Sequence, residues 1–225
     1  MNTAISGKAD GIAVAIIDQT AFDAPTANAI AAGIPVVSYN ADAPTGSPNK
    51  RMAYIGQDLY QSGYTMGTRI AGQLKTGKCV GFIATPGSLN IQPRIDGFKA
   101  ALNALSPAVQ FTQIATGADV NGETTNVEAY YLGHTDVNCM IAVDGGSTQG
   151  VAICSQKHGL AAKGVLTGGY DLLPKTLQLI QSGDMGFTID QQPYLQGFVP
   201  VVQLFLYKLS GGLQQPSNTD TGLLF

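Results

Sequence analysis

Apolar residues gather in short continuous runs along this chain, and amphipathic stretches separate one run from the next. A half-exposed strand alternates apolar and polar residues, whereas a strand buried on both faces of a parallel sheet is apolar almost throughout. The runs here are of the continuous kind. They predict parallel strands at residues 11–17, 34–39, 52–55, 79–84, 109–115, 139–143, 164–167 and 186–189.

The stretches between the runs have the spacing of helices that bury one face. Several end just before a glycine, the residue that best adopts the left-handed conformation beyond a helix. We expect Gly33, Gly77, Gly159, Gly183 and Gly211 to act in this way. The predicted helices cover residues 23–32, 58–74, 92–105, 124–133, 147–158, 173–182 and 193–209.

Strands and helices alternate strictly in this prediction. Such alternation, with a helical crossover between successive parallel strands, is typical of a doubly wound α/β fold. In these folds ligands bind beyond the carboxyl ends of the strands, so the residues that follow each strand are the candidates for a site.

Polar side chains follow nearly every predicted strand. Amides, carboxylates and one guanidinium at one sheet edge would suit a neutral, polyhydroxylated molecule, since carboxylates accept from hydroxyls and the other groups donate to them. Each residue alone also has an ordinary explanation, as a helix cap or a turn residue. The residues are Asp18, Asn40, Gln57, Asp58, Asp144, Tyr170, Asp171, Asp190 and Gln191, with the loop 85–94.

Composition narrows the range of partners. The chain has 225 residues, of which 12 are Lys or Arg and 15 are Asp or Glu, and its net charge is −3. Because no basic run is present, nucleic acid is not an expected partner. The most apolar stretch, residues 197–209, contains Pro200, Gln203 and Lys208 and is too short to cross a bilayer, so no membrane insertion is expected.

Cysteine and histidine give no sign of metal or nucleophilic chemistry. Cys79, Cys139 and Cys154 are odd in number, lack metal-binding spacing and lie in apolar surroundings, which predicts small buried side chains rather than a disulfide framework. His134 and His158 are outside any hydrolase motif. We therefore expect no metal site, no catalytic residue and no cofactor.

Five motifs resemble those of periplasmic sugar-binding proteins of ABC importers, the ribose- and galactose-binding-protein type. They occur in the family's order and cover almost the whole chain. The motifs are AxxAGIPVVSYNA (29–41), YIGQDLYQSGYTMG (54–67), GSLNIQPRIDGFKAAL (87–102), IAVDGGSTQGVA (141–152) and GGYDLLPKTLQLIQSGDMGFTIDQQPYLQG (168–197).

The resemblance implies which side chains hold the sugar. The family has a ligand-binding arginine, and in one register of the motif its position corresponds to Arg94. In the alternative register it corresponds to Gln92. Tyr170 would offer an aromatic face to the apolar side of a sugar ring. The other implied contacts are Asn40, Asn90, Asp144, Asp171 and Gln191.

The resemblance also implies a two-lobed molecule of two doubly wound parallel sheets. Residues 1–56 and 192–221 would form a remnant N-terminal lobe and residues 58–190 the C-terminal lobe, with hinge crossings near 57, 191 and 222. Compared with a typical member, the chain lacks a signal peptide and a first β-α-β unit, so we expect a truncated chain. Its incomplete first lobe would then expose apolar surface.

The implied function is a periplasmic solute receptor that binds a monosaccharide or sugar-like polyol between its lobes and delivers it to an ABC transporter permease. Such a receptor catalyses no reaction. The alternative is the effector-binding domain of a Lac-repressor-type transcription regulator. That alternative is weaker because the chain has no helix-turn-helix, and because KGVLTGGYDLL at residues 163–173 departs from the regulator pattern.

Overall fold

The computed structural model describes residues 1–225, the whole chain, which forms two compact units. Unit 1 comprises Met1–Asp58, Ser88–Asn90 and Gln191–Gly222, and unit 2 comprises Leu59–Gly87, Ile91–Asp190 and Leu223–Phe225. The interpretation of these units as lobes about a hinge stays a prediction. No helix in the chain is both long and apolar enough to cross a membrane.

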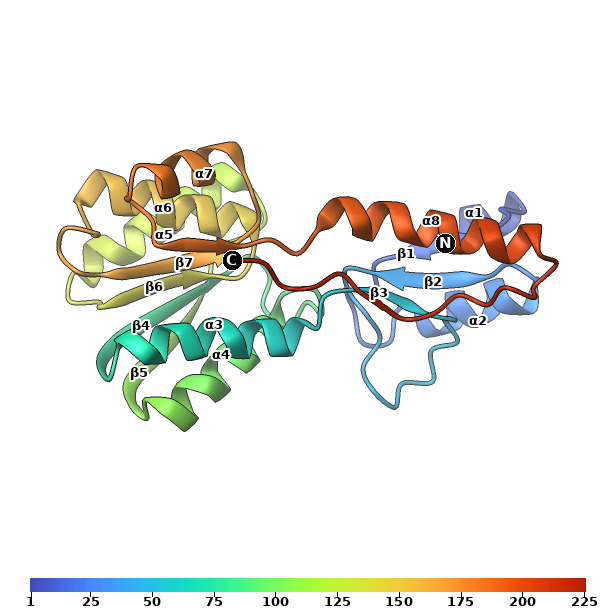
Figure 1. Ribbon diagram of the computed structural model, residues 1–225, viewed down its shortest axis with the longest axis horizontal. Coiled ribbons are helices and arrows are strands. Elements are labelled where there is room, and N and C mark those ends of the chain that lie inside the picture. The colour runs from blue at the N-terminus through green and yellow to red at the C-terminus, as the bar shows by residue number, and fades with distance from the viewer. The chain divides into compact units, whose positions relative to one another are not determined.

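Unit 1 is a four-stranded parallel sheet in the order β1-β2-β3-β9 with helices on both faces (Figure 1). Ile12, Ile34 and Val36 pack with the helices on one face, and Val37 and Ile55 pack with Leu204 on the other. The elements are α1 (Asn2–Ser6), β1 (Ile12–Val14), α2 (Asp23–Ala31), β2 (Val36–Tyr39), β3 (Tyr54–Gly56), α8 (Pro193–Leu209) and β9 (Thr219–Asp220).

An apolar surface is exposed in unit 1 beside the edge strand β1. Val201, Phe205 and Leu209 of α8 are 62%, 62% and 70% exposed, and they border a hollow that also reaches Gly11 and Ala13. These exposed side chains belong to helix α8, and the expectation that an incomplete lobe exposes apolar sheet surface stays a prediction.

Unit 2 is a five-stranded parallel sheet in the order β5-β4-β6-β7-β8. Helices α3 and α4 cover one face, and α5, α6 and α7 cover the other (Figure 1). The elements are α3 (Leu59–Gln73), β4 (Thr76–Ile83), α4 (Gln92–Leu105), β5 (Ala108–Ala115), α5 (Val120–Gly133), β6 (Cys139–Ala142), α6 (Gly145–His158), β7 (Leu166–Tyr170), α7 (Pro174–Gln181) and β8 (Phe187–Ile189).

The strand order of unit 2 reverses around β4. The next strand along the chain, β5, pairs with one side of β4, and β6 pairs with the other side. The connections that leave β4 and β6 therefore run to opposite faces of the sheet, and ligands of open α/β sheets bind beyond the carboxyl ends of such strands. Arg94 and Asp144 follow β4 and β6 and therefore lie at this edge of the sheet.

The predicted fold class is confirmed, and the predicted strands and helices all occur. The helices at 92–105 and 193–209 have the predicted ends, and the ends of the other elements are shifted. Gly33, Gly159, Gly183 and Gly211 have positive φ beyond their helices, as expected. The prediction for Gly77 was wrong. Gly77 lies inside β4 at φ 113°, because the strand starts three residues earlier than its apolar run and the helix before it ends at Gln73.

Candidate functional site

Asp144 caps helix α6 at the carboxyl end of β6. Its Oδ1 accepts a hydrogen bond from the Ser147 backbone N–H at 2.9 Å, and its Oδ2 accepts one from the Ala84 N–H, beyond β4, at 2.8 Å. The carboxylate therefore bridges the two strands on either side of the reversal. Each carboxylate oxygen has a second lone pair, so Asp144 can still accept from a hydroxyl.

Arg94 lies in the first turn of α4 and is only 1% exposed. Its Nη1 donates to the carbonyl oxygen of Val143 at 2.9 Å. Val143 is the residue that precedes Asp144 in the chain. Its guanidinium carbon lies 4.0 Å from the centre of the Tyr170 ring, and this cation–π contact offsets part of the cost of burying the charge.

Tyr170, the last residue of β7, is fully buried. Its hydroxyl lies 2.5 Å from Ser62 Oγ, and its backbone N–H donates to Thr148 Oγ1 at 2.9 Å. Because one ring face supports Arg94 and the residue has no exposed surface, Tyr170 positions the guanidinium. The Tyr170 ring is as buried as the Arg94 side chain, and its role as a stacking face for a sugar stays a prediction.

Asp171 follows Tyr170 in the left-handed conformation, with φ at 72°. Its backbone is held on both sides, since its N–H donates to Ile189 O at 2.9 Å and its carbonyl accepts from Thr188 Oγ1 at 2.7 Å. Gly145 leaves room for its side chain, because a Cβ at that position would stand 3.0 Å from Asp171 Oδ2. The second carboxylate is thus held beside the start of α6.

Two carboxyl groups at this edge, those of Asp144 and Glu123, have raised pKa values. Burial raises the pKa of Asp144, the hydrogen bonds from Ser147 and Ala84 oppose that rise, and the charge of Asp171 adds to it. Glu123 on α5 lies against the start of the same helix, and its pKa is raised to about 7 by burial and by the charges of Asp144 and Asp119. Its Oε2 is buried without a hydrogen-bond partner.

Gln92 lies apart from this cluster although it begins the same helix as Arg94. Its Oε1 accepts from the Gly87 N–H at 2.9 Å, and its Nε2 donates to Asp96 at 2.9 Å and to Gln113 at 3.3 Å. Residues two apart on a helix point in different directions. Of the two alternatives, only Arg94 contacts the residue that precedes Asp144, through the Val143 carbonyl oxygen.

Unit 1 gathers a second group of predicted residues at the carboxyl end of β2. Asn40, with φ at 60°, donates from its amide to Gln191 Oε1 at 3.0 Å and to Gln196 Oε1 at 3.1 Å. Gln196 in turn donates to the Gln191 carbonyl oxygen at 2.7 Å and to Thr221. The side chain of Asn90, in the same unit, accepts from Ser88 Oγ at 2.6 Å and makes no hydrogen bond to this group.

Sequence reasoning missed three residues that hold these groups in place, Ser62, Thr148 and Gln196, and a fourth, Glu123, that interacts with the charge of Asp144. All four lie inside helices, where a polar residue carries no distinguishing pattern. Only the packing of one element against another reveals their roles.

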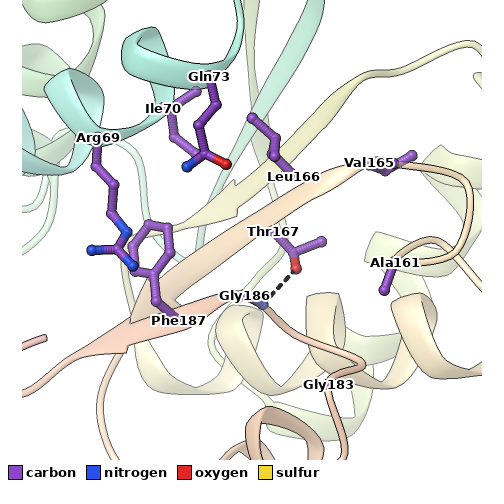
Figure 2. A pocket seen from close by; sticks show the side chains of 11 residues that line it. Arg69, Ile70, Gln73, Ala161, Val165, Leu166, Thr167, Gly183, Gly186 and Phe187 are labelled. Carbon is purple, nitrogen blue, oxygen red and sulfur yellow. Dashed lines mark hydrogen bonds between the residues drawn. The ribbon is translucent and has the colours of Figure 1, made fainter.

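Unit 2 has a further cavity at the opposite, amino-terminal edge of its sheet. It has a volume of about 260 Å³ and lies between α3 and the starts of β7 and β8 (Figure 2). Among the residues that line the cavity, the Arg69 guanidinium lies over the Phe187 ring, and the Thr167 hydroxyl accepts from the Gly186 N–H. None of the predicted ligand contacts lines this cavity.

Comparison with known proteins identifies the family. A family model described as "Periplasmic binding protein domain" matches residues 1–211, nearly all of both units. The chain belongs to this family. The resemblance found in the sequence motifs is thereby confirmed.

Two curated relatives of the family carry names that specify sugars. The chain is 47% identical over 237 aligned residues to the xylose/arabinose-binding protein XylF of Sulfolobus acidocaldarius, an alignment that takes in the whole chain and 58% of XylF. It is 27% identical to the D-galactose/methyl-galactoside binding periplasmic protein MglB of Haemophilus influenzae, over 94% of the chain and 66% of MglB. The chain thus spans less than two thirds of either relative.

Two solved structures agree with the family's fold. The ABC transporter solute-binding protein of Burkholderia graminis, in complex with D-arabinose, superposes with a TM-score of 0.88 at 25% identity, over 99% of this chain and 77% of that one. The arabinose-binding protein AraP of Geobacillus stearothermophilus, at 26% identity, superposes with a TM-score of 0.74.

Proposed function

We propose that this protein binds a monosaccharide or a sugar-like polyol and delivers it to an ABC transporter permease. Pentoses are the first candidates, because XylF, at 47% identity, is named for xylose and arabinose. The receptor would act in the periplasm or its equivalent outside the cytoplasmic membrane. It performs no reaction on the sugar.

The observation that carries this proposal is the cluster of Arg94, Asp144 and Asp171 at the strand-order reversal of unit 2. It combines one cationic donor with two anionic acceptors in a partly desolvated place. A sugar hydroxyl both donates and accepts, so it can use both kinds of group at once. Hydrogen bonds to charged partners are also stronger than those between neutral groups.

We propose a role for each of these side chains. Arg94 donates to ring or hydroxyl oxygens, and Asp144 and Asp171 accept from hydroxyls. Tyr170 holds the guanidinium in place beneath. Asn40, Asn90 and Gln191 of unit 1 are proposed as additional contacts to the same sugar. The segments near residues 57, 191 and 222, where the chain passes from one unit to the other, are proposed as the hinge.

Titration calorimetry of this chain with D-xylose, L-arabinose, D-arabinose, D-galactose and D-ribose tests the proposal. We expect one sugar or a narrow stereochemical set to bind. Asp144→Asn and Asp171→Asn should each weaken binding about 10- to 100-fold, the usual effect of losing a hydrogen bond to a charged group.

Asp136→Asn is the matched control. Asp136 belongs to the same unit but precedes β6, at the other edge of the sheet, and forms an exposed ion pair with Lys78. We expect it to bind sugar as the unaltered chain does. Unchanged affinity in both site variants would refute the site, and no binding of any sugar by the folded chain would refute the function.

A further inference from the structure

Two of the three cysteines face each other across neighbouring strands of unit 2. Cys79 of β4 and Cys139 of β6 are direct partners in the parallel register. Their sulfur atoms are 2.6 Å apart, and the side chains are 2% and 0% exposed. Both thiols belong to the core cluster beneath α3 and α4.

The geometry is close to that of a disulfide. Neighbouring strands lie about 4.8 Å apart, which falls inside the range of Cα separations that disulfides span. Two unbonded sulfur atoms normally keep a wider separation than 2.6 Å. Little movement is therefore needed to join them.

The third cysteine is separated from this pair by the sheet itself. Cys154 lies on α6 and packs in the core of the opposite face, with Val151 and Met140. In the folded chain it cannot reach either sulfur of the pair. An odd number of cysteines, which argued against a disulfide framework, is thus compatible with one bonded pair and one free thiol.

We propose that Cys79 and Cys139 form a disulfide that ties β4 to β6 when the chain folds outside a reducing compartment. The oxidant is a small disulfide, such as oxidised glutathione. One cysteine thiolate attacks it, forms a mixed disulfide and releases one thiol. The second cysteine then attacks the protein sulfur of the mixed disulfide and expels the second thiol. Two protein thiols are oxidised, and one small disulfide is reduced to two thiols that take up the two protons.

Oxidation precedes the closure of the core. The thiolate is the attacking species, and burial raises the pKa of Cys79 well above its usual range once α3 and α4 cover the sheet. The folded, reduced chain therefore resists oxidation. A chain that folds in the presence of the oxidant can form the bond while β4 and β6 pair.

The bond would act on the strands that carry the proposed sugar contacts. Arg94 follows β4 and Asp144 follows β6, and the Asp144 carboxylate already joins these two strand ends through the Ala84 N–H. A covalent link at Cys79 and Cys139 would fix the same pair of strands from within the core. It closes a long loop of chain, which restricts the unfolded state.

The test is to refold the chain from denaturant with a mixture of oxidised and reduced glutathione, and in parallel with dithiothreitol alone. Folding is verified by circular dichroism. Free thiols are then alkylated under denaturing conditions and counted by mass spectrometry, and peptide mapping locates any link. We expect one free thiol, Cys154, after oxidative refolding and three after reductive refolding, with a higher melting temperature for the oxidised form.

Variants make the assignment specific. Cys154→Ala should keep the link and leave no free thiol, whereas Cys79→Ala should leave two free thiols and the same melting temperature with and without dithiothreitol. Three free thiols in the oxidatively refolded chain, or a link that includes Cys154, would overturn the proposal. Because these readouts involve no sugar, the result is independent of the proposed function.

Discussion

At the scale of single residues, Arg94 depends on the side chain beneath it. The Tyr170 ring contacts the guanidinium, and the Tyr170 hydroxyl is held by Ser62. We expect Tyr170→Phe to keep sugar affinity, because the ring remains, and to lower the free energy of unfolding by about 1 kcal/mol through the lost hydrogen bond. Tyr170→Leu removes the ring and should weaken sugar binding as well.

Calorimetry of the two Tyr170 variants, together with urea unfolding, separates these effects. A Phe variant that loses affinity as severely as the Leu variant would show that the hydroxyl, rather than the ring, holds the arginine. The comparison is internal to one position, so it needs no assumption about the rest of the site.

Glu123 gives the protein a pH-dependent stability. Its pKa in the folded chain is about 7, against an ordinary value of 4.5, so the folded state favours the protonated carboxyl. This contribution is complete below pH 4.5 and is lost as the pH rises to about 7. Glu123→Gln should therefore raise the free energy of unfolding at pH 8 by about 1 kcal/mol, once solvent screening is considered.

Urea unfolding between pH 4 and 8 measures this effect, with Glu128→Gln as the control on the same helix. Glu128 pairs with Lys157 and His158, and its pKa is lowered by them. Its replacement should cost stability at pH 8 instead of adding it. A Glu123→Gln variant less stable than the unaltered chain at pH 8 would contradict the interpretation.

At the scale of elements, helices α3 and α4 pack closely through glycine. A Cβ on Gly63 of α3 would overlap the carbonyl oxygen of Arg94, and a Cβ on Gly97 of α4 would overlap that of Tyr60. With a larger residue at either position, α3 and α4 could not pack so closely. The contact sets the position of the α4 first turn, where Arg94 lies.

Gly63→Ala should therefore destabilise the chain by about 1–3 kcal/mol through overpacking and weaken sugar binding by displacing Arg94. Gly72→Ala on the same helix is the matched control, since nothing lies within 4 Å of its Cβ position. Gly72→Ala should raise the free energy of unfolding by up to about 1 kcal/mol. Thermal unfolding and calorimetry of the pair provide the test, and a tolerated Gly63→Ala would refute the role of this contact.

Most helices and strands could be predicted from the sequence, because the burial of their faces determines their apolar patterns. Continuous runs such as 139–143 and a helix such as 193–209 match strands and helices of the structure. The short elements α1 and β9 were not predicted, since five and two residues carry too little pattern. The strand start at Thr76 was missed because Thr76, Gly77 and Lys78 are not apolar.

At the scale of the whole molecule, sugar binding should be visible in both units. A ligand that binds only the folded state stabilises it by about 2.7 kcal/mol at a concentration 100 times its Kd. If Asn40, Asn90 and Gln191 contact the same sugar as Arg94, amide hydrogen exchange should slow in unit 1 as well as in unit 2.

Hydrogen-exchange mass spectrometry with and without the bound sugar makes this comparison. Slower exchange at the loops after β2 and β8, together with those after β4 and β6, is the expected result. Protection confined to unit 2 would remove the unit 1 residues from the proposed contacts. The exposed edge beside β1 serves as the internal reference, because no predicted contact lies there.

The sequence by itself determined the alternation of strands and helices, the α/β class and the family, because these depend on apolar spacing and on short local motifs. The tertiary structure decided which polar residues meet. Arg94 reaches Val143 and Tyr170 while Gln92 turns toward Gln113, and Cys79 lies against Cys139 although sixty residues of chain separate them. Such contacts depend on strand order and helix packing, which bring residues that are distant in the sequence close together. No local sequence pattern records these contacts.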